Sequence, residues 1–369
     1  MSFIKKYICE LLFFSFFSFV AFLRFRITGS FYEKLLWDEG WYSTIIDYGY
    51  MYNGDNGILH NVPFFPLYPL ICKALKFLIP ALHTNLAMLL IANIFAYLTI
   101  KLLFILTKEL FNYRIAAFTI AFFLSLPFSF FIFLGFTESL FFTLILSFFY
   151  FYSIKRMRFV PLIIIALASL TRIYGILLLV VYLIDLFYQK DKEALRNDIL
   201  LAPIGTIGLS LFCLYFYWIF DHPFLFLANQ IAWGHHSTND ILNLFKFKGL
   251  VVSAFEFDLS DSQSIAGVYF ILSLFLSVGI YKVLPRSFFT YYIVFFLFLF
   301  YILSPISNSI ARYLICLFPV IISVPLALLS DLGEEFQISD FRFLIFCFFL
   351  LGLNLRLLQI FFEGIHFVG

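Results

Sequence analysis

Long apolar stretches recur from one end of this chain to the other, and they limit its possible folds more than any other feature. Many of them reach the roughly 18 to 25 residues that an α-helix needs to cross the hydrocarbon core of a bilayer. Only 12% of the 369 residues are charged, about half the share found in soluble domains, and the mean hydropathy is +1.00. The strict alternation of a membrane β-barrel is absent. The sequence therefore predicts an all-α integral membrane protein.

Charge and cysteine content exclude several classes of partner. The formal net charge is only +2, and no basic run with interleaved aromatic residues occurs, so nucleic acid is not an expected partner and membrane lipid is. The five cysteines are odd in number and have no CxxC spacing, which predicts buried free thiols. The first apolar stretch has no small-residue cleavage site behind it, so we expect it to remain as an anchor.

Clusters of Lys and Arg between the apolar stretches indicate the topology through the positive-inside rule. Lys5 and Lys6 precede the first stretch and favour a cytoplasmic amino terminus, whereas Arg24 and Arg26 at its far end oppose this mildly. Four later clusters should share the cytoplasmic side: 108–114, 155–158, 190–196 and 282–286. Single crossings are expected near 7–25, 86–106, 115–134, 137–154, 199–220, 265–283, 287–304, 312–330 and 342–362.

Two segments must adjust for the basic clusters to share one side. The stretch 159–187 has to leave and return, as two short helices that meet at Thr171-Arg172. The proline-rich stretch 63–80 must not cross, and is expected to form a short interfacial helix. The result is about 11 transmembrane helices in a single domain, 1–369, with two long outer loops at 26–85 and 221–264 and the active surface facing outward.

The first outer loop carries an unusual density of polar residues at 37–69. It contains four carboxylates (Asp38, Glu39, Asp47, Asp55), His60 and two of the four tryptophans. A membrane protein with this much polarity directly after its first span is predicted to form a site there, although many such loops have no task. Three more charged residues sit at the expected outer ends of spans: Glu138, Arg172 and Arg312. Such residues line a cavity or pair with one another.

Two acids and two arginines at one depth suit the transfer of a sugar from a polyprenyl phosphate. The leaving phosphate needs no general acid, so one base and one cation suffice. Asp38 is the expected base and Glu39 the alternative, with Arg172 and Arg312 as the phosphate contacts. Helix–helix ion pairing would give the same pattern. The adjacent His235 and His236 cannot easily share a tetrahedral metal site, so we expect neither a metal nor another cofactor.

Six segments, in order, resemble the signatures of the PIG-V family, which comprises GPI mannosyltransferase 2 and its bacterial relatives among the GT-C glycosyltransferases. They are WDEGWYSTIIDYGY (37–50), FFPLYP (64–69), TESLFF (137–142), LTRIYG (170–175), DHPFLFLANQIAWG (221–234) and ARYLICLFP (311–319). The resemblance implies a GT-C fold and an inverting mannosyltransferase that uses a dolichyl-phosphate-mannose-like donor and a glycan or glycolipid acceptor. It matches Asp38 to the catalytic acid of the first outer loop. The expected substrate cavity is lined by Trp37, Trp41, Tyr42, His60, Phe65, Pro66, Glu138, Gln230, Trp233 and Tyr313.

The chain is short for a eukaryotic member and has no Asn-x-Ser/Thr sequon, which favours a bacterial plasma-membrane enzyme over one of the endoplasmic reticulum. Two other classes stay open. A multispan transporter or lipid flippase predicts an inverted repeat with a midplane site, and neither is visible in the sequence. A non-catalytic subunit of a glycosylation complex would keep the fold without a reachable acid.

Overall fold

The computed structural model describes residues 3–188, 192–233, 262–299, 310–329 and 338–364, and these are helical without any strand. The helices of the first half are α1 (Phe3–Thr28), α2 (Asp38–Tyr48), α3 (Leu67–Leu78), α4 (Thr84–Leu110), α5 (Tyr113–Ser125), α6 (Glu138–Phe149), α7 (Phe159–Thr171) and α8 (Leu177–Phe187). Those of the second half are α9 (Lys192–Leu201), α10 (Ile207–Phe220), α11 (Leu225–Ala228), α13 (Ser262–Val283), α14 (Arg286–Leu297), α15 (Ile310–Tyr313), α16 (Phe318–Leu328) and α17 (Ile338–Phe362).

Four helical segments within the described residues are long and apolar enough to cross a bilayer: Tyr7–Thr28, Thr84–Leu110, Leu195–Phe220 and Asp340–Glu363. Shorter apolar helices accompany them at Tyr113–Ser125, Glu138–Ile154, Phe159–Thr171, Ile173–Phe187, Gly267–Val283, Arg286–Leu297 and Phe318–Leu328. The chain is an integral membrane protein. The figure of about 11 crossings stays a prediction, as do the single domain and the extents of the outer loops.

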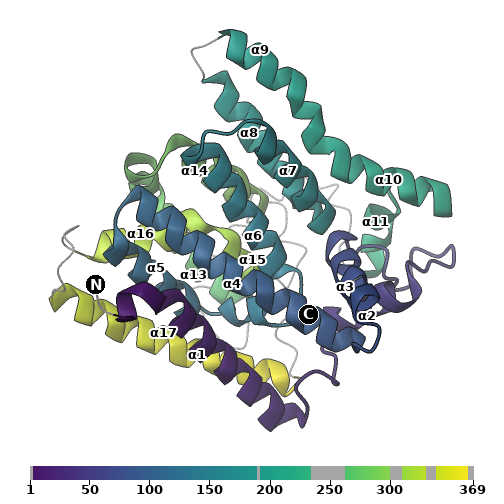
Figure 1. Ribbon diagram of the computed structural model, residues 1–369, viewed down its shortest axis with the longest axis horizontal. Helices are drawn as coiled ribbons and strands as arrows, with labels where there is room; N and C mark the ends of the chain where they lie inside the picture. The colour runs from purple at the N-terminus through teal and green to yellow at the C-terminus, as the bar shows by residue number, and fades with distance from the viewer. Residues whose placement is uncertain (1–2, 189–191, 234–261, 300–309, 330–337, 365–369) are drawn as a thin grey trace.

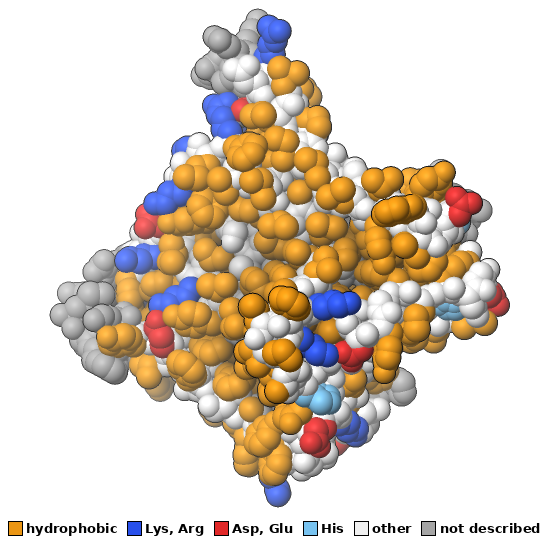
Figure 2. All heavy atoms as spheres, turned by 45° about the vertical axis from the view of Figure 1, so that its right-hand side comes forward, with side chains coloured by type: hydrophobic (Ala, Val, Ile, Leu, Met, Phe, Trp, Pro, Cys, Tyr) orange, Lys and Arg blue, Asp and Glu red, His pale blue; other side chains and the backbone are white. Residues whose placement is uncertain are grey.

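The outer surface of the bundle agrees with this assignment. Figure 2 shows a broad hydrophobic band, with charged side chains collected along the upper left edge and toward the lower right. Large apolar side chains such as Trp218 on α10, Phe275 on α13 and Phe348 on α17 are almost fully exposed. Water would make so wide an apolar surface unstable, whereas lipid solvates it.

Helices α4, α5 and α6 form the centre of the bundle, and α1 and α17 lie side by side along one edge (Figure 1). Beyond α6, the α7–α8 pair leads to the long α9–α10 segment. The three helices α2, α3 and α11 gather at one end, far from α9. Helix α4 begins at this same end, because it follows α3 in the chain and packs against both α2 and α3.

Two segments were expected to depart from a single crossing. Helix α7 ends at Thr171, and a short 3-10 turn, η3 (Ile173–Ile176), leads into α8, so the prediction of two helices meeting at Thr171-Arg172 is confirmed. The stretch 63–80 contains only α3, whose 12 residues reach about 18 Å, less than the thickness of the hydrocarbon core. Its location at a membrane surface stays a prediction.

Candidate functional site

Four helix ends carry the charged residues of the candidate site. Asp38 and Glu138 are the first residues of α2 and α6, Arg172 follows the last residue of α7, and Arg312 lies in α15. The structure brings all four side chains together. The basic segment 155–158 follows the opposite end of the helical segment Glu138–Ile154, which begins with α6 and at 1.5 Å per residue is about 25 Å long.

Ion pairs join the four side chains into one cluster. Asp38 Oδ2 lies 2.6 Å from Arg312 Nη2, and Glu138 Oε1 lies 2.6 Å from Arg172 Nη2. The same Glu138 oxygen is 3.4 Å from Arg312 Nε. The Glu138 side chain is 1% exposed and that of Asp38 is 19% exposed. The formal charges of the cluster sum to zero, and Asp38 is its most accessible member.

Each guanidinium is also held by neutral partners. Arg172 Nε donates to Thr137 Oγ1 at 2.9 Å, and Arg172 Nη1 donates to the Tyr174 hydroxyl. Arg312 Nη2 donates to the Tyr313 hydroxyl at 3.0 Å, and the ring of Tyr313 lies 4.8 Å from the Arg172 guanidinium. A guanidinium with several directed hydrogen bonds keeps a fixed orientation, which suits recognition of a planar or tetrahedral anion.

Three buried atoms of the cluster have no hydrogen bond within the described residues: Glu138 Oε1, Glu138 Oε2 and Arg312 Nε. Glu138 Oε1 and Arg312 Nε take part in the ion pairs, whereas no ion pair involves Glu138 Oε2. A buried polar atom in this state is costly unless water or a ligand supplies a donor. The cluster therefore has an acceptor position open beside its two arginines.

The turn that presents Arg172 depends on a glycine. The backbone of Arg172 leaves the helical region (φ −154°, ψ 142°), and Gly175 N donates to the Arg172 carbonyl at 2.8 Å. A Cβ atom at Gly175 would clash with the backbone carbonyl group of Ala168, so no other residue fits without a backbone shift. Gly175 thus lets η3 fold back against α7 and places the arginine at the helix end.

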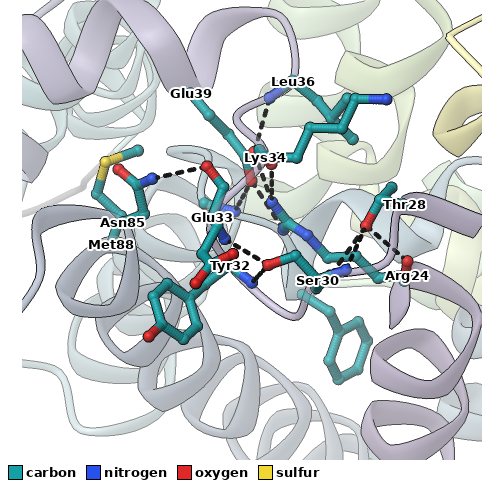
Figure 3. Close-up of polar contacts among 12 residues, drawn as sticks. Arg24, Thr28, Ser30, Tyr32, Glu33, Lys34, Leu36, Glu39, Asn85 and Met88 are labelled. Carbon is teal, nitrogen blue, oxygen red and sulfur yellow. Dashed lines mark hydrogen bonds and ion pairs between the residues drawn. The ribbon is translucent and has the colours of Figure 1, made fainter. Parts of the chain in front are cut away.

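Glu39, the neighbour of Asp38, is enclosed in a separate set of contacts. Figure 3 shows its carboxylate facing Arg24, which donates to Glu39 Oε1 at 3.1 Å and Oε2 at 2.9 Å. The backbone N–H of Leu36 donates to Oε2 at 3.0 Å, and that of Gly135 donates to Oε1 at 2.9 Å. The Glu39 carboxylate therefore joins α1, the start of α2 and the turn before α6, and so holds Asp38 next to Glu138.

The ion pair with Glu39 also explains why Arg24 lies at the end of the first span where the positive-inside rule does not expect a basic residue. Arg24 opposed the positive-inside assignment of the first span, yet it is buried and paired with Glu39. A buried, neutralised arginine carries little topological weight. The position of Arg24 at the predicted outer end of the first span was thus the sequence signal that it has a buried acidic partner.

Two tryptophans of the expected cavity lie in one group with Phe64, which was not among the predicted residues. The rings of Trp41 and Trp233 are 5.3 Å apart, and Phe64 lies 5.3 Å from Trp233 and 6.2 Å from Trp41. The hydroxyl of Tyr42 is 3.4 Å from Thr137 Oγ1, which places Tyr42 beside the charged cluster. Trp37 precedes Asp38 in a strained backbone conformation (φ 53°, ψ −123°).

The remaining predicted residues lie in other surroundings. His60 exchanges hydrogen bonds with Asn53 in the first loop, where burial lowers its pKa. Phe65 packs against Phe212 and Phe226, Pro66 precedes α3, and Gln230 is half-buried in η5 (Asn229–Trp233). None of these contacts is with the charged cluster, and the roles of His60, Phe65, Pro66 and Gln230 stay predictions.

Thr137 and Tyr174 were not singled out from the sequence. Thr137 directly precedes Glu138 in TESLFF, and Tyr174 follows Arg172 by two residues in LTRIYG, so the two motifs were the signal available. Within the described ranges, no three His, Cys, Asp or Glu side chains gather as a metal site would require. His235 and His236 lie outside the described residues.

The fold is shared with two solved membrane proteins. An archaeal oligosaccharyltransferase, AglB from Archaeoglobus fulgidus, in complex with an inhibitory peptide and a dolichol-phosphate, superposes with a TM-score of 0.54 at 14% identity. ArnT from Cupriavidus metallidurans, bound to undecaprenyl phosphate, gives 0.56 at 14% identity. The alignments cover 100% and 96% of this chain, but 57% of AglB and 76% of ArnT. This chain therefore spans little more than half the length of AglB.

Sequence comparison gives no further relative: no family model and no curated protein matches the chain. At 14% identity, the structural likeness shows the fold alone. The chain shares its fold with AglB and ArnT, and this agrees with the fold that the resemblance of its motifs implied.

Proposed function

We propose that this protein is a membrane glycosyltransferase that moves a sugar from a polyprenyl-phosphate donor to a hydroxyl group of a glycan or glycolipid. The observation that carries the proposal is the cluster of Asp38, Glu138, Arg172 and Arg312 at adjoining helix ends of a GT-C fold. A partly accessible carboxylate beside two buried guanidiniums supplies the base and the cations that this reaction needs.

In the proposed reaction, the acceptor oxygen attacks the anomeric carbon while Asp38 takes the hydroxyl proton. The new carbon–oxygen bond forms as the bond to the phosphate oxygen breaks, so the configuration inverts. The electron pair leaves on the phosphate, which becomes a monoester dianion. Arg172 and Arg312 lie where they can neutralise the added charge.

The charge of the site is conserved during this step. Before transfer, two arginines, two carboxylates and a phosphodiester sum to −1. Afterwards Asp38 is neutral and the phosphate carries two charges, so the sum is again −1. A site whose net charge does not change has little need to reorganise, which favours catalysis in a dry environment.

The geometry prefers Asp38 to Glu39 as the base. Glu39 has both oxygens engaged by Arg24 and by two backbone N–H groups, whereas Asp38 has one ion pair and is more exposed. The grouped rings of Trp41, Phe64 and Trp233 are suited to stack on a sugar.

The finer identity rests on the motifs. We propose a PIG-V-like enzyme that transfers mannose, without a metal ion, on the outer face of a bacterial plasma membrane. The support is the order of the six motifs, and the absence of a sequon. The solved proteins of this fold were captured with a dolichol-phosphate and with undecaprenyl phosphate, which supports the same class of donor lipid.

The test compares two matched substitutions in the same loop. In proteoliposomes with a polyprenyl-phosphate mannose and the membrane glycolipids of the host, Asp38→Asn is expected to lower turnover about 10²- to 10⁴-fold. Asp55→Asn changes an exposed carboxylate outside the cluster and is expected to keep wild-type turnover. Wild-type turnover in Asp38→Asn removes Asp38 as the base, and donor translocation without transfer supports a flippase instead.

A further inference from the structure

The two guanidiniums of the cluster already have carboxylate partners, which raises the question of how an anion enters. Arg172 is paired with Glu138 and Arg312 with Asp38, and the four charges cancel. A phosphate ester added to a neutral, buried cluster would carry an uncompensated charge, and this is unfavourable in a low dielectric. Its binding therefore requires that one carboxylate move away from its arginine.

Glu138 is poorly placed to move. Its side chain is 1% exposed, it begins the central helix α6, and one of its oxygens lies between the two guanidiniums. Its partner Arg172 has two further hydrogen bonds, to Thr137 and Tyr174. Displacing Glu138 would disturb three elements of the bundle.

Asp38 is better placed to move, for four reasons. Its side chain is 19% exposed, the most of the four. Its carboxylate makes one ion pair within the described residues, and it sits on the short helix α2 outside the central bundle. The residue before it, Trp37, has a positive φ of 53°, a strained backbone conformation for a bulky side chain of the kind that is found at switch positions.

We propose that the phosphate group of the donor replaces Asp38 at Arg312, and that this exchange releases Asp38 to act as the base. In the structure Asp38 Oδ2 lies 2.6 Å from Arg312 Nη2, so the ion pair holds the carboxylate at the guanidinium, and the side chain must turn away from Arg312 to face an acceptor hydroxyl. The base therefore becomes available only after the donor is bound. This inference rests on the proposed function and adds a mode of regulation to the same site.

The exchange makes an unusual prediction: removing the catalytic carboxylate improves lipid binding. Undecaprenyl phosphate, the product class, is titrated into purified protein in detergent micelles and its dissociation constant is measured by calorimetry. Asp38→Asn is expected to bind it roughly tenfold more tightly than wild type, because the competing anion is gone. Asp55→Asn should bind like wild type.

A second variant and a second probe test whether any gain in affinity comes from removal of the Asp38 carboxylate and arises at the phosphate group. Asp38→Ser, which also suits a helix start, should show the same gain in affinity. Inorganic phosphate should displace the lipid more effectively from both Asp38 variants than from wild type. If the lipid binds more tightly but inorganic phosphate does not compete, the gain comes from the lipid chain and the exchange at Arg312 is refuted.

The outcomes separate this inference from the function beneath it. If wild-type protein binds no undecaprenyl phosphate, the proposed function fails and the exchange fails with it. If Asp38→Asn loses turnover while its affinity is unchanged or weaker, the glycosyltransferase proposal stands and the exchange is overturned.

Discussion

Asp38 and Glu39 are adjacent carboxylates that each face an arginine, yet their surroundings differ. Glu39 meets Arg24 through two hydrogen bonds, and backbone N–H groups complete its set of donors. Asp38 meets Arg312 through one short contact and remains partly exposed. The Glu39 carboxylate is enclosed by its donors, whereas the Asp38 carboxylate stays partly accessible, as the proposed function requires of a base.

A third carboxylate of the same helix extends the comparison. Asp47 lies near the end of α2 and pairs with Lys76 at 2.6 Å, while Thr84 donates to it at 2.7 Å. The exposed fractions of the side chains rise from 3% for Glu39 to 19% for Asp38 and 31% for Asp47. We expect the contribution to stability to fall in the same order, because burial decides what a broken pair costs.

The largest effect on stability is expected at the closed pair. Glu39→Gln leaves Arg24 buried without a counter-charge, so it should lower the free energy of unfolding by about 3–5 kcal/mol. The measurement is denaturant unfolding in mixed micelles. The double variant Arg24→Gln with Glu39→Gln removes both charges and should recover part of the loss. An equal loss in Asp38→Asn would contradict the distinction between the two carboxylates.

A smaller effect is expected where Glu39 touches the turn before α6. A Cβ atom at Gly135 would lie 3.0 Å from Glu39 Oε1, so Gly135→Ala should push the carboxylate aside and cost about 1–3 kcal/mol. Turnover should also fall, because Asp38 follows the displacement of its neighbour. The matched control is Gly40→Ala on α2, where an added Cβ meets nothing within 4 Å. Similar losses in both variants would show that the contact with Glu39 is unimportant.

The smallest effect concerns the exposed pair and depends on pH. Partial burial opposes the charge of Asp47, but the hydrogen bonds from Lys76 and Thr84 outweigh it and lower the pKa of Asp47. The unfolded chain therefore takes up this proton first on acidification. The stabilisation is complete above the ordinary aspartate pKa of about 4 and is lost as the pH falls through the lowered value.

Asp47→Asn should cost about 0–1 kcal/mol at neutral pH, and the difference from wild type should vanish in acid. Thermal unfolding in micelles between about pH 3 and 7 gives the comparison. A difference that persists at the acid end would assign the effect to the packing of the substituted side chain and not to its charge.

Much of the architecture was readable in the sequence. Apolar length predicted helices and the membrane, and the basic clusters predicted that the chain turns back at Thr171-Arg172, where α7 ends. The order of the motifs implied the GT-C fold that the solved structures share. The number of crossings is not given by helix length, since several apolar helices in the described ranges are shorter than a bilayer is thick.

The candidate site was readable only in part. Asp38, Glu138, Arg172 and Arg312 stood out because a charge at the end of an apolar stretch is costly and needs a partner. The pairing itself was not readable, because either acid could have met either arginine. His60, Phe65 and Pro66 lie in the same polar loop, and their contacts are with Asn53, Phe212 and the start of α3, so their place in a substrate cavity stays a prediction.

By itself the sequence determined that lipid is the solvent and that helices are the elements, because both follow from composition and from the length of local runs. The tertiary structure alone decided which carboxylate of the pair Asp38-Glu39 is open. That choice depends on Arg24 and Gly135, which lie 15 and 96 residues from Glu39, and on Arg312 beyond them. Burial and partnership are properties of packed helices, so no local pattern records them.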